Sequence, residues 1–544
     1  MSARSLLNVK YDIVIGRLIL HELNSSVEFF SEMAAIEADK CKDLGNEAYK
    51  AGNFAKAVVL YGKAIDIAFP CGESDYDSDT STELSATATN ADIRAILNDF
   101  PNLHIYYSNR ALAQIKLENY GSAIGDASKA IELVPSFSKA YYRRGCSKVA
   151  LTKYKEALRD FERCCQICPQ DADAAQRLKE CKKEVQAQAF ARAIATEATL
   201  KVSETIRVED MAVPDNYSGP VYEGGRPSDE FLEKMKETFR DQKLIPAKFA
   251  YRIALESLKL LQKQPTLVDI TVGTSPGDRF TVCGDVHGQY YDLLNIFKLN
   301  GVPSDTNPYL FNGDFVDRGS FGVETVLTLF AYKLAFPEHM YLARGNHEAQ
   351  SMNRLYGFQG EIVAKYDVKL YTLFCEVFCL LPLAHVINKR VFVVHGGLFS
   401  KDDVTLADIA SVDRNREPPE SGLMAEMMWA DPISVRGRHP SKRGMGLSFG
   451  PDVTEKFLKL NDLQLVVRSH EVKDEGFSIE HGGKLVTVFS APNYCDQMGN
   501  KGAFLRLSFT EKNRDANIEY IGFDAVPHPD VRPMQYANMA AFGF

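Results

Sequence analysis

Apolar and small residues recur at a fixed spacing in the first third of the chain. Ala111, Ala123, Ala130 and Pro135 are each followed, 34 residues later, by Gly145, Ala157, Cys164 and Pro169. An earlier copy of the pattern contains Gly45, Ala57, Tyr61, Ala64 and Pro70. Small residues let two antiparallel helices approach closely, and a proline ends the second helix of each pair. The pattern therefore predicts three helical repeats over residues 38–172.

The 34-residue period is that of the tetratricopeptide repeat, which is a helix–turn–helix unit. The first two copies are 66 residues apart, so an insertion of about 32 residues, at about 71–102, separates them. Residues 71–90 are rich in Gly, Ser, Asp and Thr and favour a surface loop, because such a composition buries little apolar surface. A lengthened helix over 91–97 is the alternative. Residues 1–37 form an N-terminal extension to which the sequence assigns no role.

A single long helix is predicted after the third repeat. Residues 171–201 contain neither glycine nor proline and are rich in Ala, Lys, Glu and Gln, which favour a helix. Residues 214–227 mix Gly, Pro and Tyr, which indicates a linker between domains. We assign residues 173–213 to a helical extension and linker, and we begin the next domain at residue 214.

Short β-rich runs alternate with helical segments from about residue 229 onward. Residues 292–299 and 322–335 have the composition of helices. The predicted strands are apolar runs rich in β-branched and aromatic residues, at 280–283, 309–312, 339–342, 391–394, 463–467 and 485–489. The alternation predicts an α/β domain with at least six strands over residues 214–525, followed by a C-terminal regulatory tail at 526–544.

Composition and charge place the chain among soluble globular proteins. The 544 residues are 45% hydrophobic and carry a net charge of −9, which argues against a nucleic-acid-binding protein. The apolar stretch 11–20 is interrupted by Asp12 and Arg17 and is too short to span a membrane. Eleven cysteines without a regular framework indicate reduced thiols. We expect a monomer located in the cytoplasm, with access to the nucleus.

Each β-rich run leads directly into a polar cluster. The first three clusters are Gly-Asp-Val-His-Gly at 284–288, Gly-Asp-Phe-Val-Asp-Arg-Gly at 313–319 and Arg-Gly-Asn-His-Glu at 344–348. The later three are His-Gly-Gly at 395–397, Arg-Ser-His-Glu at 468–471 and Ala-Pro-Asn-Tyr at 491–494. In α/β sheets ligands bind beyond the carboxyl ends of the strands, so we expect these loops to converge on one crevice.

The residue types in these loops favour a pair of metal ions. Asp285 and His287 are two residues apart at a strand end, so their side chains can face the same way. Carboxylate, imidazole and amide ligands suit Mn, Fe or Zn, and the absence of cysteine from the clusters argues against a structural zinc site. The carboxylate of Asp314 can bridge two cations. Two cations about 3.5–4 Å apart hold a phosphoryl oxygen and generate a hydroxide at neutral pH.

The motifs G-D-x-H-G, G-D-x-V-D-R-G and G-N-H-E resemble those of the phosphoprotein phosphatase family of metallophosphatases. The resemblance covers roughly residues 38–540. It implies a multi-domain fold, with an all-α tetratricopeptide repeat domain followed by an α/β metallophosphatase domain. That second domain would be a central β-sandwich flanked by helices, with a dinuclear metal site at the strand ends. The implied activity is hydrolysis of phosphoserine and phosphothreonine in phosphoprotein substrates.

The resemblance also implies a role for each matching residue. It assigns one divalent ion to Asp285, His287 and Asp314, and the second to Asp314, Asn346, His395 and His470, the metals being Mn, Fe, Zn or Mg. It makes His347 the general acid, oriented by Asp317. It lets the substrate phosphate contact Arg318, Asn346, His347, Arg443 and Tyr494. Taken alone, the flanks of His395 and His470 also fit simple turns, and Lys-Arg-Gly around Arg443 also fits a solvated charge run.

The repeats resemble a clamp for two carboxylates. Five residues match that clamp: Lys42, Asn46, Asn109, Lys139 and Arg143. The resemblance implies that they bind the acidic C-terminal peptide of the 90-kDa heat-shock chaperone, which ends in Met-Glu-Glu-Val-Asp. The alternative is that they are ordinary solvated charges on helices.

The resemblance further implies self-inhibition, with the repeats folded over the active site. The matching acid is Glu118, whose carboxylate would mimic phosphate against Arg318 and Tyr494. The apolar residues of segment 534–544, which include Met534 and Tyr536, suggest that the tail packs on the repeats as a latch.

Two other functions fit parts of this pattern. A chaperone-binding scaffold with an inactive phosphatase domain is one, but such decay removes metal ligands and none is missing here. A diesterase or nucleotidase with the same two-metal core is the other. The combination of Arg318, Arg443 and Tyr494 favours a phosphate monoester over a diester.

Overall fold

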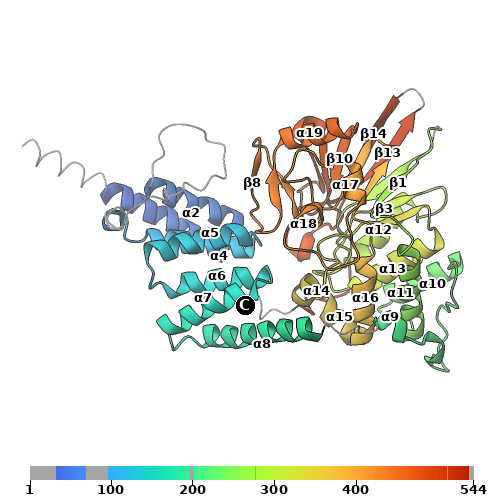
Figure 1. Cartoon of the computed structure of the whole chain (residues 1–544), viewed down its shortest axis with the longest axis horizontal. Coiled ribbons are helices and arrows are strands. Elements are labelled where there is room, and N and C mark those ends of the chain that lie inside the picture. Colours follow the sequence, from blue (N-terminus) through green and yellow to red (C-terminus); the bar gives the residue numbers. More distant parts are fainter. Residues whose placement is uncertain (1–31, 69–95, 195–200, 276, 511–512, 538–544) are drawn as a thin grey trace, which may run out of the picture. The chain divides into compact units, whose positions relative to one another are not determined.

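Pairs of antiparallel helices build the N-terminal part of the chain (Figure 1). The structure, a computed structural model, describes residues 32–68, 96–194, 201–275, 277–510 and 513–537. A helix over residues 32–50 precedes α2 (Phe54–Ala68). The following pairs are α4 (Leu103–Lys116) with α5 (Tyr120–Leu133), and α6 (Ser138–Ala150) with α7 (Tyr154–Ile167). The three predicted repeats are therefore present as helix pairs.

The small residues of the repeat pattern lie where two helices meet. A Cβ atom added to Gly145 in α6 would lie 2.8 Å from the ring of Phe161 in α7, and one added to Gly45 would lie 2.7 Å from the ring of Tyr61 in α2. Ala111 is fully buried. The period read from the sequence is thus the spacing at which one helix must approach its partner closely.

The segments around the repeats only partly follow the prediction. Helix α8 (Ala172–Ile194) occupies most of the predicted helix 171–201, and 195–200 lie outside the described residues. The predicted loop 71–90 and most of the N-terminal extension lie outside them too. Residues 214–227 pack as part of the second unit, because the ring of Tyr222 is buried against Phe231 and its hydroxyl donates to Glu256. Most residues of this predicted linker are nevertheless exposed.

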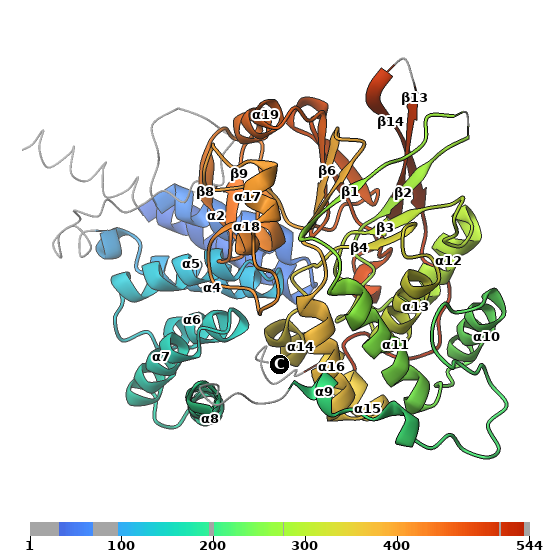
Figure 2. The same ribbon diagram turned by 45° about the vertical axis from the view of Figure 1, so that its right-hand side comes forward.

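The chain divides into two compact units, Met1–Ala191 and Arg192–Phe544, and the second is a β-sandwich (Figure 2). One sheet has the order β1-β5-β6-β10-β12-β11, the other the order β14-β13-β2-β3-β4. The first consists of β1 (Leu267–Ile270), β5 (Ala384–Ile387), β6 (Val391–Val394), β10 (Leu465–Arg468), β11 (Phe477–Glu480) and β12 (Leu485–Val488). The second consists of β2 (Phe280–Cys283), β3 (Tyr309–Phe311), β4 (Met340–Leu342), β13 (Gly502–Thr510) and β14 (Asn513–Phe523).

Helices cover both outer faces of the sandwich (Figure 2). A buried cluster packs the sheet of β2 and β3 against α10 (Asp229–Arg240), α11 (Ala247–Leu261), α12 (Tyr290–Asn300), α13 (Gly322–Ala335) and α16 (Val368–Cys379). A second cluster packs the sheet of β5 and β6 against α17 (Leu406–Ala410), α18 (Leu423–Trp429) and α19 (Pro451–Leu460). The inner faces meet in a third cluster that includes Val282 and Val393. The predicted sandwich with flanking helices is confirmed.

Smaller elements complete this unit. A three-stranded sheet contains β7 (Asp431–Pro432), β9 (Leu447–Phe449) and β8 (Arg438–Pro440), and short helices include α9 (Val202–Thr205), α14 (Gln350–Tyr356) and α15 (Phe358–Lys365). Among the described residues, no helix combines the length and the apolar character that crossing a membrane requires. Every described cysteine is a free thiol, as the sequence suggested.

The close approach of α6 and α7 leads to a stability prediction. Gly145→Ala should lower the free energy of unfolding of the repeat unit by about 1–3 kcal/mol, because the added methyl group would overlap the fully buried ring of Phe161. Gly125→Ala, in the middle of α5 where an added Cβ atom would have no neighbour within 4 Å, is the matched control and should raise stability by about 0.5–1 kcal/mol through helix propensity. Urea unfolding followed by circular dichroism measures both, and equal effects of the two changes would contradict this account of the repeat spacing.

Candidate active site

The polar loops meet where the carboxyl ends of six strands converge. Strands β2, β3 and β4 run parallel in one sheet, and β6, β10 and β12 run parallel in the other. The two sheets are joined at this end by a parallel bridge between Asp285 and Phe489 and by a hydrogen bond from Ser490 N to Asp285 O of 3.0 Å. The six loops therefore meet at one end of the two sheets, and each sheet contributes three of them.

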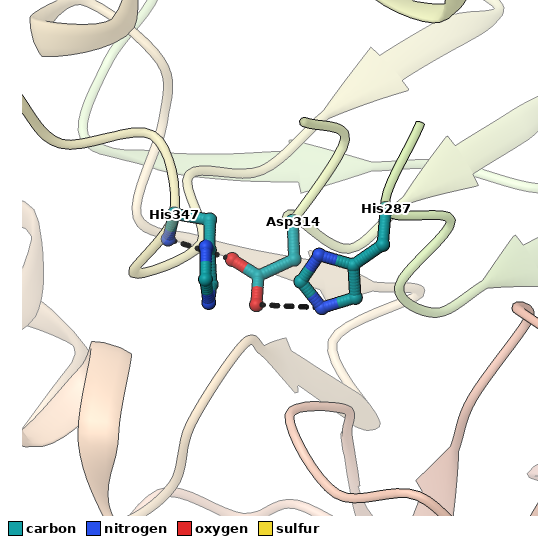
Figure 3. Close-up of side chains that lie close together, drawn as sticks. All are labelled: His287, Asp314 and His347. Atoms are coloured by element: carbon teal, nitrogen blue, oxygen red, sulfur yellow. Dashed lines mark hydrogen bonds and ion pairs between the residues drawn. The ribbon is translucent and has the colours of Figure 1, made fainter. Parts of the chain in front are cut away.

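The carboxylate of Asp314 lies at the centre of this site (Figure 3). Its Oδ2 atom is 3.6 Å from Nε2 of His287 and 3.3 Å from Nε2 of His395. Its Oδ1 atom accepts a hydrogen bond of 2.8 Å from the backbone N–H of His347. One carboxylate from the β3 loop thus faces histidines from the β2 and β6 loops.

The remaining predicted metal ligands surround Asp314. Asp285 Oδ2 lies 3.7 Å from His287 Nε2, and Asp285 Oδ1 accepts a 3.2 Å hydrogen bond from the N–H of His470. Asn346 Oδ1 lies 2.8 Å from His395 Nε2. All six residues predicted as metal ligands are buried and lie in this one site.

The donor groups fit two divalent cations. Two overlapping groups, His287–Asp314–His347 and Asp314–His395–His470, each bring their ligand atoms within 4.8 Å of one another. The Nε2 atom of His470 is buried and has no hydrogen-bond partner among the described residues, as expected of a nitrogen that faces a cation. The Nδ1 atoms of His287 and His395 lie 3.0 Å and 2.7 Å from the carbonyl oxygens of Val316 and Asn312. Such outer contacts fix the orientation of metal-binding imidazoles.

The electrostatics of the protein groups alone also favour added positive charge. Burial raises the pKa of Asp285 to about 7 and that of Asp314 to about 8. Burial also lowers the pKa values of His287 and His470, so both imidazoles are neutral. Neutral imidazoles are the form that binds metal, and a cation beside the two carboxylates would restore their ionisation.

His347 and Asp317 form the arrangement expected of a general acid and its orienting carboxylate. His347 Nδ1 lies 2.8 Å from Asp317 Oδ2. The other oxygen of Asp317 accepts a 2.8 Å hydrogen bond from Phe358 N, and Asn353 Nδ2 donates to the carbonyl of His347. Burial and the positive charges of Arg318 and Arg443 lower the pKa of His347. A phosphate dianion beside the two arginines would offset their positive charge and so raise the pKa of His347.

Two arginines and a tyrosine border the same site. Arg443 Nε donates to Asp431 Oδ2 at 2.6 Å, and its Nη2 donates to the carbonyl of His470 at 2.9 Å. It is thus a positioned group and not part of a solvated charge run. Arg318 follows Asp317 directly and is buried. The ring of Tyr494 lies 5.1 Å from that of His287.

Several site residues have a left-handed backbone conformation, which is uncommon for residues other than glycine. The φ angles are 42° for His287, 52° for Asp314, 70° for Asp317 and Arg318, and 71° for His470. The loops therefore turn sharply as they leave the strands, which directs these side chains into the space between the sheets. Backbone strain of this kind is concentrated at functional sites.

Sequence reasoning missed three buried supporting residues. Glu348 accepts hydrogen bonds from the N–H groups of Asp314, Phe315 and Gly345, which holds the β3 and β4 loops together. Asp431 binds Arg443 with one oxygen and Arg468 with the other, the latter at 2.8 Å. Glu348 and Arg468 lie inside recognised motifs, so the sequence did carry a signal for these two residues. Asp431 lies in none, and only the fold places it beside Arg443.

Four of the five predicted clamp residues belong to one linked group in the repeats. Asn46 Oδ1 accepts a hydrogen bond from Asn109 Nδ2 at 3.2 Å, and Arg143 Nη1 lies 3.3 Å from Asn109 Oδ1. Burial lowers the pKa of Arg143 to about 10, so it stays charged at neutral pH. Lys42 lies one turn before Asn46 and pairs with Asp39 at 3.1 Å. Lys139 is exposed at the start of α6.

Glu118 lies in the turn between α4 and α5, with a left-handed φ of 61°. The tail beyond β14 contacts the second unit, since Met534 N donates to the carbonyl of Arg318 and Tyr536 lies beside Lys365. The hypothesis of a latch on the repeats remains a prediction for 538–544, which lie outside the described residues.

Comparisons with known proteins agree with this geometry. Residues 278–474 match the calcineurin-like phosphoesterase family, 138–171 a tetratricopeptide repeat, and 178–269 the PPP5 TPR repeat region. The chain is 47% identical to human serine/threonine-protein phosphatase 5 over 92% of its own length and 93% of that protein. It is 49% identical to serine/threonine-protein phosphatase T of Trypanosoma brucei brucei, over 93% and 99% of the two chains.

A solved structure resembles the catalytic unit. It is a protein serine/threonine phosphatase from Saccharomyces cerevisiae with similarity to human phosphatase PP5, 41% identical, with a TM-score of 0.54 and coverage of 57% of this chain and all of that one. The scaffold and diesterase alternatives are therefore set aside. The chain belongs to the family of serine/threonine-protein phosphatase 5, and it is a serine/threonine phosphatase with divalent metal ions in its catalytic domain and tetratricopeptide repeats before it.

Proposed function

We propose that the chain hydrolyses phosphoserine and phosphothreonine monoesters of proteins in one in-line step, under the control of its repeats. The observation that supports this most directly is the Asp314 carboxylate between His287 and His395 in a buried site bordered by two arginines. Two bound divalent cations would polarise the phosphoryl oxygens and lower the pKa of a water molecule. The ligands would be Asp285, His287, Asp314, Asn346, His395 and His470.

Other side chains of this site bind the phosphate and protonate the leaving group. Arg318 and Arg443 hold the phosphate oxygens, since a planar guanidinium donates two parallel hydrogen bonds to an oxyanion. Tyr494 adds a hydrogen bond from its hydroxyl. His347, oriented by Asp317 at 2.8 Å, donates a proton to the leaving seryl or threonyl oxygen. The negative charge that develops there is thereby neutralised without a covalent phosphoenzyme.

The proton-donor role of His347 leads to the first test of this mechanism. His347→Asn should lower kcat on a phosphoserine peptide by about 10²- to 10⁴-fold, because general acid catalysis contributes about that much. Metal content, measured by plasma mass spectrometry, should stay at the wild-type value. His439→Asn, outside the site, is the matched control. Wild-type turnover of the His347 variant would contradict the assignment.

We further propose that the repeats bind the acidic C-terminus of a 90-kDa heat-shock chaperone. The support is a partly buried, charged Arg143 within reach of Asn109, with Asn46 and Lys42 beside them. A carboxylate is the group that such a cluster of one guanidinium, one ammonium and two amides recognises. The pairing of Lys42 with Asp39 and Asp43 is partly exposed, so a peptide carboxylate can exchange for these partners.

Calorimetric titration of a peptide ending in Met-Glu-Glu-Val-Asp tests this clamp. Arg143→Ala should weaken binding by about 10- to 100-fold, as expected from losing hydrogen bonds to a charged group. Amidation of the peptide's C-terminus should weaken it similarly, because one of the two carboxylates is lost. Lys129→Ala, on the exposed face of α5 where Lys129 pairs with Glu132, should change nothing. Equal affinity of wild type and Arg143→Ala would exclude the clamp.

We also propose that Glu118 restrains basal activity by occupying the place of phosphate beside Arg318 and Tyr494. The support is its position in the short turn between α4 and α5, where its backbone has a left-handed φ of 61°. Glu118→Ala should raise basal turnover of a small phosphate ester several-fold, to about the level that saturating chaperone peptide produces in the wild type. Glu132→Ala is the control. Unchanged basal turnover of Glu118→Ala would reject this role.

A further inference from the structure

The segment that follows β14 is fastened across the catalytic unit beside the phosphate site. We name residues 526–537 the C-terminal strap. Its first anchor is a hydrogen bond of 2.9 Å from Val526 N to the buried carboxylate of Asp292. The later anchors are the pair His528–Asp496 at 3.2 Å, the bond from Ser320 Oγ to Arg532 O at 2.8 Å, and the bond from Met534 N to Arg318 O at 2.7 Å.

Met534 of the strap lies against the guanidinium of Arg318. Arg318 Nη1 lies 4.0 Å from the sulfur of Met534. The carbon of the same guanidinium lies 3.7 Å from the centre of the Tyr356 ring. An arginine stacked on an aromatic ring and packed against a thioether has few rotamers left, because each neighbour excludes part of its conformational space.

Both residues that meet here have a left-handed backbone. The φ angle is 55° for Met534 and 70° for Arg318. Glycine adopts this conformation without strain, whereas a long side chain does so at a cost. A methionine at such a position indicates that its side chain makes a contact that glycine could not make. The contact with Arg318 is that contribution.

We propose that Met534 is a positioning residue of the phosphatase, which holds the guanidinium of Arg318 in the orientation that binds the substrate phosphate. The strap is thereby part of the active site although its chain position is more than 200 residues away from Arg318. An arginine fixed before the substrate arrives loses less conformational entropy on binding, which strengthens phosphate binding. This inference rests on the proposed role of Arg318 as a phosphate ligand.

The variant Met534→Gly, made in the full-length chain, tests whether Met534 positions Arg318 or only stabilises the fold. Glycine keeps the N–H that binds Arg318 O and accepts the left-handed φ, so the thermal denaturation midpoint should not fall. The dissociation constant of inorganic phosphate, measured by calorimetric titration of the manganese-loaded protein, should rise by about 3- to 10-fold. KM for a phosphoserine peptide should rise by a similar factor, with a smaller change in kcat. Met534→Leu keeps an apolar neighbour and should restore most of the affinity.

Two control variants distinguish the role of Arg318 from that of Met534. Met498→Ala, an exposed methionine on the loop after Tyr494, should leave phosphate affinity unchanged. Arg318→Ala should weaken phosphate binding more than Met534→Gly does. Unchanged affinity in Arg318→Ala would overturn the proposed role of Arg318 itself. Weaker binding in Arg318→Ala with wild-type affinity in Met534→Gly would overturn only the positioning role of Met534.

Discussion

The buried carboxylate of Asp314 is the group on which the architecture of the site depends. It faces His287 and His395 and also receives the backbone N–H of His347, so three loops are held around one side chain. Its backbone is fixed by Glu348 and has a left-handed φ of 52°. A carboxylate excluded from water in this way is costly unless positive charge accompanies it. The folded chain therefore needs positive charge beside this carboxylate, and the metal ions of this family supply it.

The two-sheet fold explains how distant parts of the sequence supply that site. Each sheet ends in three short loops, and the Asp285–Phe489 bridge joins the two loop sets at their carboxyl ends. Gly345 is required because a Cβ atom there would lie 2.2 Å from Asp314 Oδ1. Beyond the ligands, Asp431 connects Arg443 to the fully buried Arg468, which ties the phosphate-binding edge to the core of the sandwich.

Much of this was predictable from sequence, and the omissions have physical causes. The predicted strands at 280–283 and 391–394 and the helix at 322–335 have the observed bounds, because continuous apolar runs mark fully buried elements. The edge strand β11 was missed because two of its four residues are polar and none of the four is buried, as is common at the edge of a sheet. The six predicted metal ligands come together because each lies in a loop that leaves the carboxyl end of a strand. Asp431 and Met534 act through contacts across the fold, for which local sequence carries no signal.

Anomalous X-ray diffraction from crystals grown with Mn²⁺ tests most directly whether the Asp314 carboxylate lies between two cations. The account predicts two anomalous peaks on either side of the Asp314 carboxylate, about 3.5–4 Å apart. One peak should lie beside Asp285 and His287, and the other beside Asn346, His395 and His470. A single peak, or peaks bound away from Asp314, would contradict it.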